Sequence, residues 1–227
     1  MRRDSLCAVA SYRGWKIRFC DSFEFLFDIV YENFVGGAYD DLNVVGRSVV
    51  DVGAGVGDTP ILFVLRGARR VIALEPYPSL YRKALVNVGI NGVRDRVILV
   101  NAGLGPFDGE VCAEMEDVHG YYLFNPSEKC DTKVRMYTLR SLIRELGVER
   151  NSILKVDCEG CEYEAILRAA SEDLKVFDEI IIEYHNGYVE LKRFLEDLGF
   201  SVSIKPIRSS PQPIEKQGYI VAKRGVK

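Results

Sequence analysis

An apolar run that stops at an acid and enters three closely spaced glycines is the feature that most constrains this chain. It reads VVDVGAGVGDTP and spans residues 49–60. Such a run is typical of a strand covered on both faces of a parallel sheet, and the glycines predict a sharp turn into a helix capped by Asp58 or Thr59. Ligands of such sheets bind beyond the carboxyl ends of the strands. The stretch therefore predicts an α/β fold with a ligand at the glycine turn.

Strand and helix patterns alternate through the rest of the chain. We expect further strands at RVIALEP, RVILVNAG, ILKVDCEG and DEIIIEYH, and helices at PSLYRKALVNVGING and YVELKRFLEDLG. The last two apolar runs, FSVSIKP and GYIVAKR, have no helix between them, which predicts a hairpin with one antiparallel strand. Residues 47–227 are therefore predicted to form one doubly wound, Rossmann-like α/β domain.

The first 46 residues are predicted to pack on this domain as an extension. LCAVASYRGWKIRFC alternates apolar and polar residues around a turn at Arg13-Gly14, which indicates a β-hairpin. DSFEFLFDIVYENF has a capping box at Asp21 and Glu24 and apolar residues at helical spacing, and Gly36-Gly37 ends it. Residues 105–137 form an insertion that is a candidate cover for the acceptor site.

Charge and cysteine usage limit the partners and the compartment. The formal net charge is −3, with 30 basic against 33 acidic side chains, so no general attraction to DNA or to an anionic membrane is expected. No run approaches the roughly 18 apolar residues of a membrane span, and no signal peptide is recognisable after Met1-Arg2-Arg3. The cysteines are scattered, which favours reduced thiols and a cytoplasmic location. They are Cys7, Cys20, Cys112, Cys130, Cys158 and Cys161.

The glycine spacing and the acid ahead of it favour S-adenosylmethionine over a dinucleotide. Gly53, Ala54, Gly55 and Gly57 give G-x-G-x-G, whereas the dinucleotide fingerprint is G-x-G-x-x-G. Asp51 would repel a pyrophosphate but suits the ammonium of the methionine tail. The plainer alternative is a tight loop in which Asp51 caps a helix.

The ends of the next two predicted strands supply the remaining cofactor candidates. Glu75 follows the second strand and is placed to accept the hydroxyls of a ribose. Pro76 and Tyr77 are expected to flank the adenine, and Asn101 and Ala102 to face its edge. The predicted cofactor is therefore S-adenosylmethionine.

Five blocks of the chain, taken in order, resemble the FkbM-type family of S-adenosylmethionine-dependent methyltransferases. They are VVDVGAGVGDTP, VIALEPYPSLYRKALVNVGING, TLRSLIRELG, ILKVDCEGCEYEAI and EIIIEYH. The resemblance implies a class I fold, a mostly parallel seven-stranded sheet in the order 3-2-1-4-5-7-6 with strand seven antiparallel. It also implies methyl transfer, usually to a hydroxyl of a sugar, polyketide or similar small molecule.

The resemblance also assigns residues by position. Asp51, Gly53, Gly55, Glu75 and Asn101 correspond to the cofactor pocket, and Asp157 and Glu159 to the edge of the active site. Cys161 stands where relatives usually have alanine, and the first block has Ala-Gly-Val where many relatives have Ala-Asn-Xaa.

The end of the fourth strand carries the first catalytic candidates. A hydroxyl nucleophile must lose its proton as it attacks, and a nearby carboxylate can take it. Asp157 is the candidate base, with Glu159 beside it; the alternative for Asp157 is a cap for the helix that starts at Gly160. Glu162 is expected on that helix, making surface ion pairs.

The fifth strand adds Glu183 and His185, two residues apart and therefore on one face. His185 is a candidate base or substrate ligand, or a structural hydrogen-bonding residue. With Asp157 these residues could gather a divalent cation, but their spacing is not specific and no metal is predicted. Cys158 and Cys161 are a single C-x-x-C pair without a second pair, and we expect thiols and no zinc.

The predicted function is O-methylation of a small-molecule or glycan-like acceptor. Asp157-Cys158-Glu159-Gly160 lacks the proline and aromatic ring with which enzymes hold the exocyclic amine of a base. Methylation of RNA at a ring nitrogen or a ribose, and a non-enzymatic S-adenosylmethionine-binding module, are the alternatives. In the insertion, Tyr121, Tyr122 and Phe124 either cover the sheet edge or line the acceptor pocket, and His119 is expected at the surface.

Overall fold

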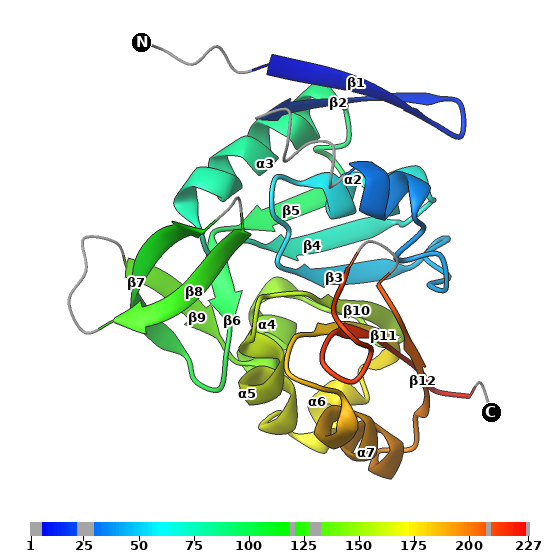
Figure 1. The fold of residues 1–227 in the computed structure, drawn as a ribbon, viewed down its shortest axis with the longest axis vertical. Coiled ribbons are helices and arrows are strands. Elements are labelled where there is room, and N and C mark those ends of the chain that lie inside the picture. Colours follow the sequence, from blue (N-terminus) through cyan, green and yellow to red (C-terminus); the bar gives the residue numbers. More distant parts are fainter. Residues whose placement is uncertain (1–5, 22–29, 119–120, 128–132, 208–209, 226–227) are drawn as a thin grey trace.

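A seven-stranded sheet forms the centre of the computed structural model, which describes residues 6–21, 30–118, 121–127, 133–207 and 210–225 (Figure 1). Its strands are β3 (Ser48–Val52), β4 (Arg70–Leu74), β5 (Val97–Val100), β10 (Ser152–Val156), β11 (Phe177–Tyr184), β12 (Ser201–Lys205) and β13 (Gly218–Lys223). They lie in the order β5-β4-β3-β10-β11-β13-β12, and β13 runs antiparallel to both of its neighbours. The predicted strand order and closing hairpin are confirmed.

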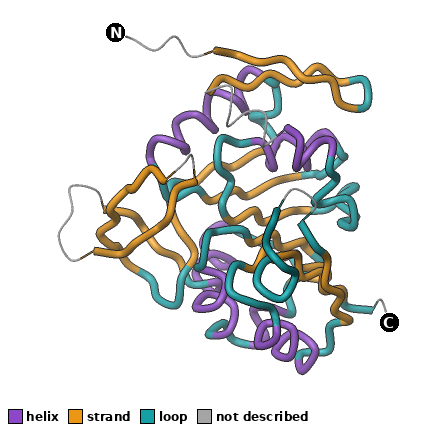
Figure 2. The backbone as a smooth tube through the Cα atoms, viewed as in Figure 1, coloured by secondary structure: helices purple, strands orange, loops and turns teal. Residues whose placement is uncertain are grey.

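Helices cover both faces of this sheet (Figure 2). One face is covered by the short helix η1 (Val30–Val35), α2 (Asp58–Leu65) and α3 (Pro78–Ile90). The other is covered by α4 (Leu139–Leu146), α5 (Cys161–Leu167), α6 (Ser171–Leu174) and α7 (Val189–Asp197). Alternate strand residues, such as Val49 and Val50, enter opposite core layers, as a sheet buried on both faces requires. None of the helices in the described ranges could cross a membrane.

The predicted N-terminal hairpin is confirmed as β1 (Leu6–Tyr12) and β2 (Trp15–Asp21), joined at Arg13-Gly14. The hairpin packs on α3, where the Cys20 backbone N–H donates to the Asn87 side chain over 2.9 Å. Helix η1 ends at Val35, directly before the predicted stop at Gly36-Gly37. Glu24 of the expected capping box lies outside the described residues.

A second, four-stranded sheet lies beside the first, at the left in Figure 1. It consists of β6 (Ala102–Leu104), β7 (Gly109–Val118), β8 (Tyr121–Ser127) and β9 (Lys133–Tyr137), in the order β6-β9-β7-β8. Most of the 105–137 insertion is therefore sheet, and Tyr121, Tyr122 and Phe124 belong to β8. His119 lies outside the described residues.

Two local predictions were wrong. The third strand was expected to run unbroken through RVILVNAG, but it divides at Asn101 into β5 and β6, which belong to different sheets. The N-cap of α2 is Gly57, not Asp58 or Thr59, because both side chains bind elsewhere. Asp58 Oδ2 accepts from Asn33 Nδ2 over 2.6 Å, and the Thr59 hydroxyl donates to Asp51 Oδ2 over 2.6 Å.

The expectation of reduced thiols was also wrong. Disulfides join Cys7 to Cys20 and Cys158 to Cys161, Cys112 is disulfide-bonded as well, and no cysteine among the described residues is a free thiol. The hairpin register places Cys7 directly opposite Cys20. The Cα atoms of Cys158 and Cys161 are 5.4 Å apart, within the usual range for a bridge. The spacing of the cysteines in the sequence did not reveal these two pairings. The first depends on the β1–β2 hairpin, and the second on the turn between β10 and α5.

Reduction should therefore destabilise the protein. The Cys7–Cys20 bridge has a sequence separation of 13, and closing a loop of that size stabilises a fold by about 3 kcal/mol. We expect Cys7→Ser/Cys20→Ser to lower the free energy of unfolding by about this amount, measured by urea unfolding. Cys158→Ser/Cys161→Ser, whose separation is 3, should lose less. Complete alkylation of all six cysteines in the native, unreduced protein would contradict the bridges.

Candidate active site

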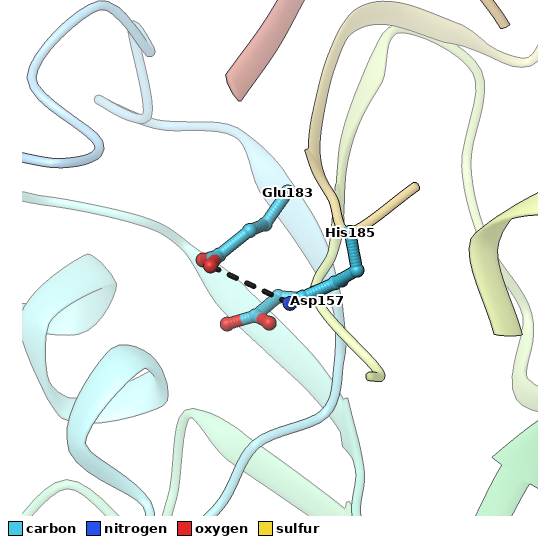
Figure 3. A group of neighbouring side chains, drawn as sticks. All are labelled: Asp157, Glu183 and His185. Atoms are coloured by element: carbon cyan, nitrogen blue, oxygen red, sulfur yellow. Dashed lines mark ion pairs between the residues drawn. The ribbon is translucent and has the colours of Figure 1, made fainter. Parts of the chain in front are cut away.

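Five acids lie at or just beyond the carboxyl ends of neighbouring strands. Asp51 is on β3, Glu75 follows β4, Asp157 and Glu159 lie in the loop after β10, and Glu183 is near the end of β11. Because β3, β4, β10 and β11 are parallel, these side chains share one edge of the sheet. Figure 3 shows Asp157, Glu183 and His185 converging there. This edge is the candidate active site.

The glycine turn connects β3 to α2 at this edge. Gly53 and Gly55 both have positive φ, +80° and +52°, and both are partly exposed. A Cβ on Gly53 would lie 1.7 Å from the Asp157 carbonyl oxygen, so the turn lies directly against the end of β10. Gly57 is buried instead: its Cβ position lies 3.1 Å from the Ala84 backbone of α3, and it permits close packing of α2 and α3. Ala54 is buried within the turn.

Glu75 fixes the shape of the turn from the next strand. Its Oε2 accepts from the Gly55 N–H over 2.8 Å, and its Oε1 accepts from the Tyr77 N–H over 2.9 Å. Burial raises its pKa to about 8, although the two N–H groups oppose this. The Asn101 amide donates to the carbonyls of Glu75 and Pro76 over 2.8 and 3.0 Å, so it braces the loop.

The other two adenine candidates differ in exposure. Pro76 is partly exposed, and Tyr77 is buried beside it. Ala102 is fully buried in the core between the sheet and helices α4 to α7, so its side chain offers no open surface.

Asp51 faces into the protein. Its carboxylate is fully buried, accepts from Thr59, and lies 3.0 Å from the ammonium of Lys155. Burial raises the pKa of Asp51, while Lys155 and Thr59 lower it. Sequence reasoning overlooked Lys155. A lysine inside the otherwise apolar run ILKV was the available signal, because a charge there requires a buried partner.

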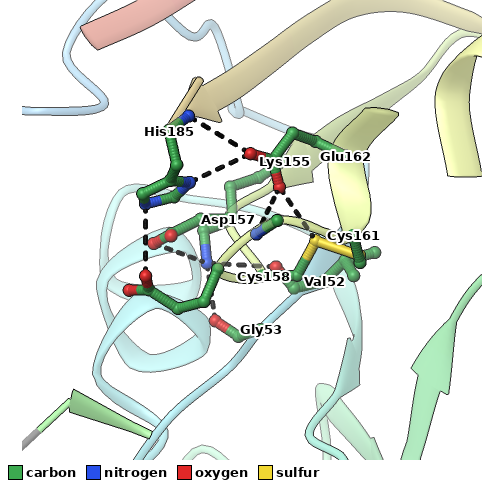
Figure 4. Close-up of a disulfide and its surroundings, with 10 residues drawn as sticks. Val52, Gly53, Lys155, Asp157, Cys158, Cys161, Glu162 and His185 are labelled. Atoms are coloured by element: carbon green, nitrogen blue, oxygen red, sulfur yellow. Dashed lines mark hydrogen bonds and ion pairs between the residues drawn. A yellow bond between two sulfur atoms is a disulfide. The ribbon is translucent and has the colours of Figure 1, made fainter. Parts of the chain in front are cut away.

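Glu162 and His185 form a buried ion pair, and the expectation that Glu162 makes only surface pairs was wrong. Glu162 is fully buried, and its Oε1 lies 3.0 Å from His185 Nδ1 and accepts from the His185 backbone N–H over 3.2 Å. Its Oε2 accepts from the Gly160 N–H over 2.9 Å and lies 3.6 Å from Cys158 Sγ. Glu162 therefore joins β11 to the disulfide loop (Figure 4).

His185 is held as an imidazolium. Burial alone would lower its pKa, but Glu162, Glu183 and Glu159 raise it to about 11. Its Nε2 lies 3.4 Å from a Glu159 oxygen and 3.6 Å from Glu183 Oε1. A histidine already protonated at neutral pH cannot act as a base there.

Of the remaining carboxylates, those of Asp157 and Glu159 are partly accessible and that of Glu183 is buried. The side chains of Asp157 and Glu159 are 26% and 32% exposed, and that of Glu183 is 11% exposed. Asp157 Oδ2 faces Lys155 and the Tyr39 hydroxyl, at 3.6 and 3.4 Å. Asp157 does not cap α5, whose N-cap is Gly160. Tyr39 comes from the first 46 residues, and no sequence pattern pointed to it.

Burial and the neighbouring Asp157 raise the pKa of Glu183 to about 8. Gln217 Nε2 donates to Glu183 Oε1 over 3.2 Å. Glu183 is therefore a buried carboxylate of raised basicity beside Asp157 and His185.

Asp157, Glu183 and His185 each offer one ligand atom within 4.8 Å of the others. A divalent cation there would need a lone pair on the imidazole. An imidazolium protonated on both nitrogens has none. A metal ion there would have to displace a proton from His185.

Comparison with solved structures identifies the fold. The fold resembles the METTL16 MTase domain, at 14% identity and a TM-score of 0.53 over 87% of this chain and 67% of that one. It also resembles a putative rRNA-methylase from Clostridium thermocellum, at 13% identity and a TM-score of 0.51 over 85% of this chain and 97% of that one. At these identities the likeness is one of fold, that of a class I methyltransferase.

The family follows from the sequence match. Residues 51–202 match the model of the methyltransferase FkbM domain, and the chain belongs to this family. It is an S-adenosylmethionine-dependent methyltransferase, as predicted. Methyltransferase sdnD of Sordaria araneosa is 24% identical over 216 residues, which cover 77% of this chain and 82% of sdnD. AMB antimetabolite synthetase AmbE of Pseudomonas aeruginosa is 26% identical over 228 residues; the match covers 78% of this chain but only 11% of AmbE.

Proposed function

We propose that this methyltransferase transfers the methyl group of S-adenosylmethionine to a hydroxyl oxygen of a small-molecule or glycan-like acceptor. The observation that carries the proposal is the cluster of Asp157, Glu159 and Glu183 beside the glycine turn. S-adenosylmethionine supplies an electrophilic methyl carbon, and the acceptor oxygen must lose its proton as it attacks. The cluster offers carboxylates where that proton can be taken.

The residues of the turn fit the cofactor. Gly53 and Gly55 are partly exposed between the ends of β3 and β4, with no Cβ to obstruct a ligand. Each Glu75 oxygen accepts one backbone N–H, which leaves it a further lone pair for a ribose hydroxyl. Asp51 is engaged by Lys155 and Thr59, so we assign it to holding the turn rather than to direct contact with an ammonium group.

The acid–base roles follow from the contacts of each group. His185 is already protonated, so we assign it to orienting Glu183. Glu183 is the stronger candidate base, because its raised pKa gives it affinity for a proton near neutral pH. Asp157 has one oxygen, Oδ2, facing Lys155 and Tyr39, and we assign the other to the acceptor hydroxyl.

The same charges disfavour RNA as the acceptor. An RNA phosphate near the methyl donor would meet three carboxylates, and the cations Lys155 and His185 are already paired with acids. Proteins that bind nucleic acid normally present unpaired basic surface. Residues 105–137, which lie partly in the second sheet, are the proposed cover of the acceptor site.

Transfer of label from tritiated S-adenosylmethionine tests the proposed acceptor. The protein is incubated separately with total RNA and with a glycan and metabolite extract, and Glu183→Gln serves as the control for background. We expect an alkali-stable methyl ether in the small-molecule or glycan fraction. Label found only in RNA bases would contradict the proposal.

Binding of S-adenosylhomocysteine tests the cofactor site. Glu75→Gln is expected to weaken its binding by about 1–3 kcal/mol, because an amide NH₂ would face a donor where the carboxylate accepts. Titration calorimetry measures the change, with NAD as the control ligand. An unchanged affinity in the variant would remove Glu75 from the pocket, and tight NAD binding by the parent would contradict the cofactor.

A further inference from the structure

Lys155 is a buried cation at the junction of β3 and β10. Its register partner across the parallel pair is Asp51, so both side chains lie on the same face of the sheet. The Lys155 side chain is 1% exposed, and burial alone would lower its pKa. Asp51 and Asp157 instead raise that pKa, so Lys155 remains charged inside the core.

The Lys155 ammonium also contacts groups other than Asp51. Lys155 Nζ donates to the Gly53 carbonyl oxygen over 2.6 Å and lies 3.3 Å from the Val52 carbonyl oxygen. It also lies 3.6 Å from Asp157 Oδ2 (Figure 4). One side chain therefore contacts both the glycine turn and a carboxylate of the candidate active site.

The neighbouring backbone makes these contacts specific. The Asp157 N–H donates to the Val52 carbonyl over 3.0 Å, and the Gly53 N–H donates to the Leu74 carbonyl over 3.0 Å. The peptide after Gly53 is held from both sides: its N–H, that of Ala54, donates to the Leu74 carbonyl over 2.9 Å, and its carbonyl oxygen accepts from Lys155. A charge-assisted hydrogen bond of this kind is about twice as strong as a neutral one.

We propose that Lys155 is a positioning residue. It holds the Gly53 carbonyl in the orientation needed to bind S-adenosylmethionine, and it fixes the position of the Asp157 carboxylate at the same time. The proposal rests on the proposed cofactor site. It assigns to Lys155 a role in binding that neutralisation of Asp51 alone would not give.

A comparison of two variants separates positioning of the Gly53 carbonyl from neutralisation of Asp51. Lys155→Met alone would leave Asp51 charged and buried, which is strongly destabilising. Asp51→Asn/Lys155→Met removes both charges and keeps similar volume, so we expect it to fold, as urea unfolding would show. Its affinity for S-adenosylhomocysteine, measured by calorimetry, is expected to be about 10-fold or more below that of Asp51→Asn alone.

Tyr39→Phe is the matched control, because Tyr39 contacts Asp157 but has no hydrogen bond to the turn. We expect it to keep the parental affinity for S-adenosylhomocysteine. If Asp51→Asn/Lys155→Met does not fold, the affinity of Asp51→Asn/Lys155→Gln for S-adenosylhomocysteine is compared with that of Asp51→Asn instead. An affinity within twofold of Asp51→Asn would overturn the proposal and leave Lys155 as a counter-ion. Failure of the parent to bind S-adenosylhomocysteine would instead refute the cofactor site itself.

Discussion

Gly53→Ala is expected to abolish binding of S-adenosylhomocysteine and to destabilise the fold. Gly53 has a φ of +80°, which costs an alanine about 1–2 kcal/mol. Its new Cβ would also lie 1.7 Å from the Asp157 carbonyl oxygen, an overlap of backbone that no rotamer change can relieve. The ends of β3 and β10 would have to separate, at a further cost of about 1–3 kcal/mol or more. Urea unfolding and titration calorimetry measure the two effects.

Gly92→Ala is the control for backbone strain alone. Gly92 also has positive φ, +68°, but its Cβ position meets no heavy atom within 4 Å. This variant should lose only the about 1–2 kcal/mol of backbone strain and should keep the parental affinity for S-adenosylhomocysteine. Equal behaviour of the two variants would show that the turn does not lie against Asp157.

The positions of the strands could be predicted because each strand leaves a strong local pattern, whereas their order in the sheet followed from the resemblance to the FkbM-type family. Continuous apolar runs ending in glycine or an acid marked β3, β4, β10 and β11, and the missing helix before GYIVAKR marked the antiparallel β13. The break between β5 and β6 could not be predicted in this way. It depends on Asn101 binding the carbonyls of Glu75 and Pro76, which are distant in sequence.

The candidate site could be predicted only in part. The residues around a strand end show where the strand stops, so Asp157, Glu183 and His185 were placed at one edge correctly. The contact partner of a side chain lies elsewhere in the chain, and the neighbouring sequence does not show it. Lys155 was overlooked and Glu162 was assigned to the surface, because the first needs Asp51 on another strand and the second needs His185.

Glu183→Gln is expected to lower turnover about 10²- to 10⁴-fold while leaving affinity for S-adenosylhomocysteine within about twofold of the parent. Glutamine keeps the size of the side chain and one acceptor oxygen but cannot take a proton. Because a base acts when deprotonated, turnover of the parent should rise with pH through a pKa of about 8. The variant should lose this rise. The assay uses the extract fraction that accepts label from tritiated S-adenosylmethionine.

Glu179→Gln is a matched control on the same strand. Glu179 is also buried on β11, but it lies at the opposite end, where it pairs with Arg47 and Lys223. Its loss should lower the free energy of unfolding without changing the pH dependence of turnover. Parental turnover in Glu183→Gln would exclude Glu183 as the base. If Asp157→Asn then lost turnover with unchanged cofactor affinity, Asp157 would be the base that takes the proton of the acceptor hydroxyl. That hydroxyl would then have to approach from the side of Tyr39 and Lys155.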